Sequence, residues 1–380
     1  MSHQPDNNAL NPWYFMYQPV SYRLQGRMGT RAQLRNMIKT CRSYGVRVYA
    51  DAVVNHMTGS GNDAQDHRNN NGGCVYWPGK QSSAENTING QSPYYTPGFT
   101  YGKNSYGNDR NVLEFPAVPY GPMDFHCEKA LNSWTDGNIL NTGWLTGLTD
   151  LDTSKEFVRQ RIADYFVDLL SIGISGFRVD AAKHIHPDDL AAIFKKFKDG
   201  MGGSFPEDWF TWLEVITGGE ASLLLNGDGD YSYSTYLESK LKEQGMSSDD
   251  IDKIKIWLSG YPSEPHNDGG RLNMKRKVIQ NDDHDQQNDG SSSRDMHDSG
   301  CVLVKGCNPD SHRQFEIKLF TDPYGGCDND NDYPIRMVLS SYYFENGVKA
   351  IPDGLSDCTK CTTTCEGCRT RTYIKAYDPD

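Results

Sequence analysis

The sequence lacks an apolar run long enough to cross a membrane, and its first residues lack the apolar centre of a signal peptide. No stretch approaches the roughly 18 apolar residues that a spanning helix needs, and the chain opens with MSHQPDNNALNPWYF. An excess of positive charge is also missing, because 38 basic residues stand against 50 acidic ones. The resulting net charge of −12 argues against a nucleic-acid partner. We therefore expect neither nucleic acid nor a membrane as a partner.

Ten cysteines are present, and four of them crowd into CTKCTTTCEGC at residues 358–368. Two CxxC pairs are a possible zinc site, but zinc ribbons separate such pairs by more than about ten residues. Here the separation is only TTT. We favour disulfides over zinc, with free thiols as the third alternative. Disulfides would place the chain in an oxidising compartment, either outside the cell or in an endomembrane or lysosomal lumen.

Helical and strand-like patterns alternate along the chain. Helices are expected at 31–45, 154–173, 186–200 and 236–245, and strands at 46–56, 174–182, 210–216, 276–282 and 335–344. Ser154 is the expected N-cap of the second helix. This alternation predicts a parallel sheet, and the number of units favours a closed (β/α)8 barrel of the TIM type.

Arg178 and Asp180 stand two residues apart in an apolar strand pattern, GFRVDAA. Alternate residues of a strand share a face, so the two side chains should point together. The arginine should lower the pKa of Asp180 and keep it ionised, which suits a nucleophile. A structural ion pair between strands is the alternative, and this stretch alone leaves it open.

Glu214 lies in a second strand pattern, WFTWLEVI. Apolar neighbours should raise its pKa and keep it protonated near neutrality. One ionised and one protonated acid on neighbouring strand ends is the arrangement of a retaining glycosidase. A buried structural glutamate satisfied by backbone donors is the alternative. A third acid, Asp285, follows a later strand in NDDHDQQ and favours the catalytic interpretation.

Four segments of the chain resemble the signature regions of the α-amylase family, in the same order. They are DAVVNH (51–56), GFRVDAAKH (176–184), LEVI (213–216) and DDHD (282–285). Segments similar to eukaryotic α-amylases also occur at 11–22, 145–153 and 336–342. The resemblance covers nearly the whole chain. It implies endo-acting hydrolysis of α-1,4-glucosidic bonds in starch or glycogen by a retaining double displacement. A related α-glucan transferase and an inactive glucan-binding fragment are the alternatives.

The resemblance also implies roles for individual residues. Asp180 would be the nucleophile, Glu214 the general acid and then base, and Asp285 the third carboxylate. Arg178 would hold Asp180 in place. The remaining substrate contacts would be Trp13, Tyr17, Gln18, His56, Lys183, His184 and His284. For Trp13, ordinary packing stays an alternative.

A structural Ca²⁺ is implied in the same way, and Ca²⁺ prefers hard oxygen ligands. The matching positions are the side chains of Asn55 and Asp150, the main-chain carbonyl of His184 and a carbonyl near Asn141.

Chloride, which binds to some animal members of the family, is not expected here. Asp283 stands where those members have an asparagine, and Met337 stands where they have an arginine.

The domain organisation that the resemblance implies has four parts. Residues 1–56 and 146–350 would form the catalytic barrel, 57–145 an irregular, calcium-linked insertion after the third strand, and 351–380 a Cys-rich C-terminal segment. Against the family pattern, the first β/α unit and the C-terminal β-sandwich would be missing. We therefore expect a fragment of a longer amylase, monomeric, with α-glucans as its partner.

Overall fold

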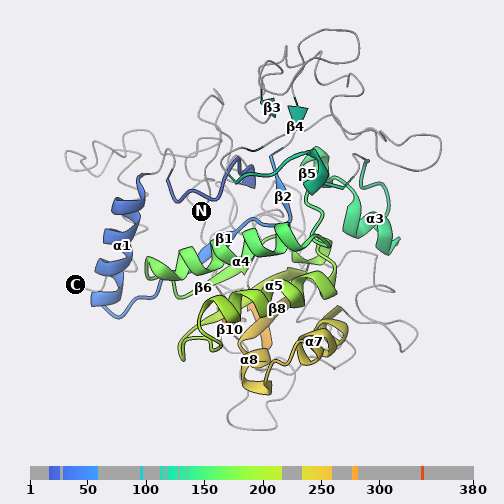
Figure 1. Ribbon diagram of the computed structural model, residues 1–380. Coiled ribbons are helices and arrows are strands. Elements are labelled where there is room, and N and C mark those ends of the chain that lie inside the picture. The colour runs from blue at the N-terminus through green and yellow to red at the C-terminus, as the bar shows by residue number, and fades with distance from the viewer. Residues whose placement is uncertain are drawn as a thin grey trace, which may run out of the picture.

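The computed structural model describes a parallel β/α assembly (Figure 1). It covers residues 17–25, 29–58, 95–96, 112–113, 115, 118–126, 129–134, 136–215, 233–258, 276–280 and 335–337. Its main sheet has the strand order β1-β6-β7-β8-β9-β10. These strands are β1 (Ala50–Ala52), β6 (Gly176–Val179), β7 (Phe210–Val215), β8 (Ile254–Leu258), β9 (Lys277–Gln280) and β10 (Ile335–Met337). Every neighbouring pair is parallel, as the alternating pattern predicted.

Helices connect the strands and cover the sheet. They are α1 (Arg31–Ser43), α3 (Gly137–Thr142), α4 (Glu156–Ser171), α5 (Pro187–Gly200), α7 (Tyr233–Glu243) and α8 (Ser248–Asp252). Three short 3-10 turns are η3 (Pro122–Asp124), η4 (Leu145–Gly147) and η5 (Ala182–His184). No helix in the described ranges combines the length and apolar character that crossing a bilayer requires.

Aromatic side chains form the contact between the covering helices and the sheet. Phe166 of α4 stacks on Phe177 of β6, with ring centroids 4.6 Å apart. Phe197 of α5 meets the same two rings edge-on, and all three side chains are fully buried. Such large apolar groups contribute most of the burial that fixes a helix on a sheet.

Two local expectations were wrong in detail. The strand expected at 46–56 divides into β1 and β2 (His56–Met57), and β2 pairs antiparallel with β5 (Thr149–Asp150) instead of joining the main sheet. Helix α4 begins after Lys155, because Ser154 binds the Asp152 carboxylate and does not cap the helix.

Several described elements were not predicted from the sequence. They are β8, α3, α8 and the antiparallel pair β3 (Tyr95–Thr96) and β4 (Val112–Leu113). Each is short, so a periodicity over a long window does not reveal it. With β8 included, the DDHD segment follows the fifth strand of the sheet and not the fourth.

Gly176 allows the close approach of β6 and β7. A Cβ at this position would lie 1.7 Å from the Phe210 carbonyl oxygen. We therefore expect Gly176→Ala to lower the free energy of unfolding by about 1–3 kcal/mol or to prevent folding. Thermal unfolding followed by circular dichroism measures the effect. Gly121→Ala is the matched control, because no atom lies within 4 Å of its new Cβ, and equal melting temperatures for the two variants would contradict the prediction.

Candidate active site

Arg178 lies at the centre of the candidate site, on β6 and almost fully buried. Its Nη1 donates to Asp180 Oδ1 at 2.7 Å and to Asp51 Oδ1 at 2.8 Å. Its Nη2 donates to Glu214 Oε1. The arginine therefore joins carboxylates that come from β1, β7 and the end of β6. The expected contact between Arg178 and Asp180 is confirmed.

The surroundings of Glu214 differ from those expected. Besides Arg178, the main-chain N–H of Ala181 donates to Glu214 Oε2 at 2.7 Å. Ala181 has a left-handed backbone, with φ 49° and ψ 32°, which turns the chain immediately after Asp180 and aims this N–H at the carboxyl group. A non-glycine residue in this region costs energy and occurs often at functional sites. The carboxyl group of Glu214 is thus held by polar donors on both oxygens, within otherwise apolar neighbours.

The expectation that Arg178 keeps the pKa of Asp180 low was wrong. Burial raises the pKa of Asp180 well above its usual range, the Glu214 charge raises it further, and Arg178 lowers it by less. Asp180 therefore lies beside a second carboxyl group that shares its cation, and this arrangement favours the protonated form of Asp180.

Tyr17, Asp51 and His56 form a hydrogen-bonded group beside Arg178. The Tyr17 hydroxyl donates to Asp51 Oδ2 at 2.8 Å, and the Tyr17 ring centroid lies 5.9 Å from Arg178 Cζ. His56 Nε2 lies 3.1 Å from the Tyr17 carbonyl oxygen. Burial lowers the pKa of His56 to about 4, so the ring is neutral and donates through Nε2. The partly exposed Gln18 follows Tyr17 directly.

Asp51 belongs to the Arg178 group, and sequence reasoning passed over it. It lies within DAVVNH, but only the register of β1 against β6, which places it opposite Arg178, reveals its role.

Lys183 and His184 lie on η5 and contact an aromatic ring from the segment that precedes α3. The Trp134 ring centroid is 4.6 Å from Lys183 Nζ and 5.9 Å from the His184 ring. His184 Nδ1 is 2.9 Å from the Leu140 carbonyl oxygen, and burial lowers the pKa of His184 to about 3. Trp134 remains 45 % exposed, so it presents a flat apolar face beside two expected substrate contacts. No local pattern distinguishes it in the sequence.

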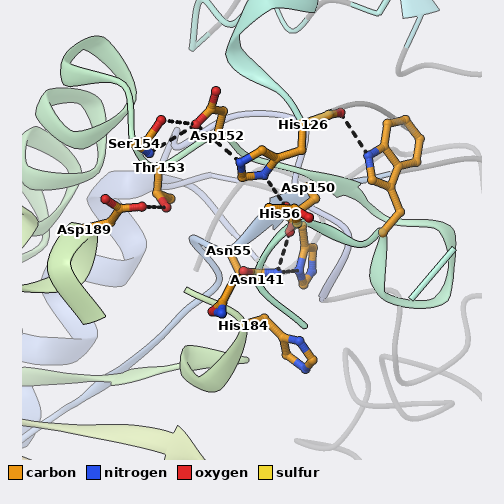
Figure 2. Close-up of polar contacts among 12 residues, drawn as sticks. Asn55, His56, His126, Asn141, Asp150, Asp152, Thr153, Ser154, His184 and Asp189 are labelled. Carbon is orange, nitrogen blue, oxygen red and sulfur yellow. Dashed lines mark hydrogen bonds and ion pairs between the residues drawn. The ribbon is translucent and has the colours of Figure 1, made fainter. Parts of the chain in front are cut away.

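The expected calcium ligands lie where β2, β5, α3 and η5 meet (Figure 2). Asn55 Nδ2 lies 3.3 Å from Asp150 Oδ1, and both residues are buried. The side-chain oxygen of Asn141 is buried without a hydrogen-bond partner in the described part. Within that part, no three or more His, Cys, Asp or Glu side chains form a metal-binding cluster. A cation here would depend on amide and carbonyl oxygens around one carboxylate.

His126 was not expected at this place, and it contacts Asp150 directly. Its Nδ1 lies 2.6 Å from Asp150 Oδ2 and its Nε2 lies 3.4 Å from Asp152 Oδ1. Burial lowers the pKa of His126, but the hydrogen bonds to the two carboxylates outweigh it and raise that pKa to about 9. Burial raises the pKa of Asp150 to about 6. Near neutral pH, Asp150 is therefore paired with a cationic imidazole.

Several predicted residues lie outside the described residues: Trp13, Asp283, His284, Asp285 and the cysteine cluster at 358–368. Met337 ends β10 and stands opposite Gln280 of β9. Cys41, partly buried, is the one cysteine in the described ranges, and its thiol is free.

Known proteins resemble this chain over most of its length. A family model described as the α-amylase catalytic domain matches residues 17–200. Pancreatic α-amylase of Rattus norvegicus is 32% identical over 359 residues, which cover 90% of this chain and 58% of the rat protein. The α-amylase of Phaedon cochleariae is 33% identical over 342 residues, covering 88% and 57% of the two chains. The chain thus spans less than two thirds of the length of these relatives.

A solved structure supports the fold. The crystal structure of α-amylase I from Eisenia fetida superimposes with a TM-score of 0.54 at 23% identity, covering 87% of this chain and 57% of the other. At this identity the likeness concerns the fold alone, and it agrees with the six parallel strands of the described sheet. Together with the sequence relatives, it shows that the chain has the (β/α)8-barrel fold and belongs to the α-amylase family of glycoside hydrolases.

Proposed function

We propose that the chain hydrolyses internal α-1,4-glucosidic bonds of starch or glycogen with retention of configuration. The observation that carries the proposal is the contact of one guanidinium, Arg178, with both Asp180 and Glu214. Retaining enzymes hold their two carboxyl groups about 5–5.5 Å apart, whereas inverting enzymes leave a wider gap for water. A shared arginine fork favours the shorter separation.

In the first step, Glu214 would protonate the glycosidic oxygen while Asp180 attacks the anomeric carbon. This step requires the proton on Glu214 and the negative charge on Asp180. In the second step, Glu214 would take a proton from water as that water attacks the glucosyl–Asp180 ester. The sugar is released with its original configuration, and both carboxyl groups return to their starting states. Asp285 is proposed as the third carboxylate.

The remaining residues would bind the glucan on either side of the cleaved bond. Tyr17 offers its ring beside Arg178, and the contact of His56 with the Tyr17 carbonyl oxygen would hold that segment in place. A direct contact between His56 and the sugar stays a sequence-based proposal. On the leaving-group side, Trp134 offers an exposed ring held by Lys183 and His184, and aromatic faces pack well on pyranose rings. We extend the proposed substrate contacts with Trp134 for this reason. Gln18, Trp13 and His284 stay as sequence-based proposals.

We also propose a structural Ca²⁺ at Asn55, Asp150 and the oxygens of Asn141 and His184. These ligands fit Ca²⁺, because they are hard oxygen atoms. A cation would also give the Asn141 side-chain oxygen a partner, which it lacks among the described residues, and would stabilise the buried negative charge of Asp150. When bound, Ca²⁺ would supply positive charge that ties the insertion to the barrel. The Asn55 amide would present its oxygen to the ion, which leaves its nitrogen for His56.

The localisation, oligomeric state and partner of the protein are proposed from its similarity to α-amylases. We propose a secreted or lumenal, monomeric enzyme with an α-glucan as its partner. One relative in the family, α-amylase I of Eisenia fetida, has also been solved as a mutant in complex with maltohexaose. A related glucan transferase is the second candidate, and the products of a starch digest distinguish the two.

The first prediction concerns Asp180. Asp180→Asn should lower turnover of soluble starch by about 10⁴-fold or more, because an amide cannot form the covalent intermediate. Reducing-end release measures turnover, and starch affinity gels measure binding, which should persist. Asp168→Asn is the control, since this carboxylate binds Arg31 on the outer helices. A variant with wild-type turnover would refute the assignment, whereas longer glucans in place of reducing ends in the wild type would indicate a transferase.

A second prediction concerns Asp51. Asp51→Asn should reduce kcat/KM by about 10- to 100-fold, because the amide removes the charge that pairs with Arg178 and offers one acceptor oxygen to two donors, Arg178 and the Tyr17 hydroxyl. The negative charge of Asp51 raises the pKa of Asp180, so its loss should move the acid limb of the kcat/KM profile to lower pH. Stopped assays from pH 4 to 9 measure this shift. An unchanged acid limb with a reduced kcat would mean that Asp51 acts only through folding.

Removal of calcium gives a third prediction. Chelation should lower the melting temperature, because a ligand that binds only the folded chain adds about 2.7 kcal/mol when present at 100 times its Kd. In Asp150→Asn the melting temperature should no longer respond to chelator. Asp124→Asn, which alters a carboxylate bonded to the Gly121 N–H, should respond like the wild type. An identical response of all three proteins would place any bound calcium elsewhere.

A fourth prediction concerns chloride. With Asp283 in place of an amide, we expect activity to be the same in chloride-free buffer and in about 0.1 M chloride, apart from general screening. Matched sulfate buffers of equal ionic strength provide the control. A saturable activation by chloride, but not by sulfate, would show that the alignment of Asp283 or Met337 is wrong.

A further inference from the structure

Helix α1 carries a stripe of positive charge in an otherwise acidic chain. Seven basic and no acidic residues lie between positions 7 and 50, so the rest of the chain holds 31 basic and 50 acidic residues. Four of the seven are Arg31, Arg35, Lys39 and Arg42, all on α1. Their spacing of four, four and three residues places them on one side of the helix.

The two ends of this stripe are fixed, and its middle is open. Arg31 forms a two-pronged ion pair with Asp168 of α4, with both contacts at 2.6 Å. Arg42 donates to the Ser175 hydroxyl at 2.9 Å. Between them, Arg35 and Lys39 are exposed and make no hydrogen bond or ion pair with another described residue. Figure 1 shows α1 at the outer edge of the described structure, apart from α3 and α7.

The acidic remainder of the chain limits which anionic partner could use the stripe. The charges of a membrane or a folded acidic protein extend far beyond one helix, and they would be repelled by the rest of a chain with net charge −12. Repulsion weakens only beyond a screening length of about 8 Å at physiological salt. A narrow, linear polymer can follow the stripe, which spans about 16 Å, and the carboxylate of Asp168 at one end of it is already paired with Arg31.

The spacing and chemistry of the stripe favour a sulfated polysaccharide among linear polymers. The basic groups recur about every 6 Å, which suits singly charged groups repeated along a chain. The planar guanidinium group of an arginine can donate two parallel hydrogen bonds to two oxygens of one oxyanion. Tyr44, the C-cap of α1, is 78 % exposed at the end of the helix and offers a flat face to a sugar ring. Single-stranded nucleic acid, in contrast, needs several stacking aromatics.

We propose that α1 binds a linear sulfated polysaccharide along Arg31, Arg35, Lys39 and Arg42. The stripe shares no residue with the candidate active site, so this binding is separate from glucan hydrolysis. It would hold the protein near anionic glycans and leave the cleft free for its substrate. Affinity should fall steeply as salt rises, because each ion pair formed releases a counterion.

The test uses the whole chain and dextran sulfate, with neutral dextran as the reference polymer. Binding is measured by affinity electrophoresis between about 50 and 200 mM salt, a range over which multiple ion pairs weaken strongly. The wild type should bind dextran sulfate and show no binding to neutral dextran. Arg35→Glu/Lys39→Glu should lose at least about tenfold in affinity and show a shallower salt dependence. Starch hydrolysis by this variant should be unchanged, which shows that it folds.

A matched variant separates the stripe from bulk charge. Lys195→Glu/Lys242→Glu alters two lysines of α5 and α7 with the same change in net charge, and it should keep the wild-type affinity for dextran sulfate. Equal losses in the two variants, or no wild-type binding, would overturn the proposal. Tighter binding to phosphorylated dextran, to an oligonucleotide or to anionic vesicles would also overturn it in favour of that ligand.

Discussion

The buried guanidinium of Arg178 is the group on which the candidate site depends. A buried carboxylate without a partner is costly, and two of them, Asp180 and Glu214, converge on this one cation together with the partly exposed Asp51. Removing the arginine would leave uncompensated charge from β1, β6 and β7 at once. One positive charge does not balance three negative charges, which agrees with the raised pKa of Asp180. The proposed retaining mechanism needs one protonated and one ionised acid, and Arg178 brings the two carboxyl groups proposed for these roles to one cation.

The parallel sheet makes this convergence possible. Asp51 stands opposite Arg178 across β1 and β6, and Arg178 stands opposite Trp212 across β6 and β7, so Glu214 follows two residues later at the carboxyl end. Parallel strands bring such ends to one edge, where loops carry the chemistry. The left-handed turn at Ala181 then adds a main-chain donor that no side-chain pattern encodes. Strand register fixes the carboxylates, and one strained residue completes their hydrogen bonding.

Much of this arrangement could be predicted from the sequence, because it follows from local periodicity and ordered motifs. The helices α1, α4 and α5 and the strands β6 and β7 were found within a few residues. The direction of the Asp180 pKa could not be found in this way, because it depends on how deeply the group is buried and on how many carboxylates share Arg178. Trp134 and His126 were missed for a related reason. Each acts through a partner far along the chain, Lys183 and Asp150 respectively, and neither lies in a distinctive motif.

The rule that governs Arg178 also governs the second buried carboxylate, Asp150. Asp150 is nearly inaccessible to solvent, and its hydrogen bonds with Asn55 and His126 are too few to cancel the cost of burial, since its pKa stays raised at about 6. Without calcium, the compensating charge is the imidazolium of His126. A calcium ion bound to the same carboxylate would supply two positive charges, so that the charge of His126 would no longer be needed to compensate Asp150. The candidate active site therefore uses a fixed arginine, whereas at Asp150 the proposed calcium ion would exchange with the imidazolium of His126. Such a difference is reasonable, because catalysis needs a constant field and Asp150 needs only a cation of sufficient charge.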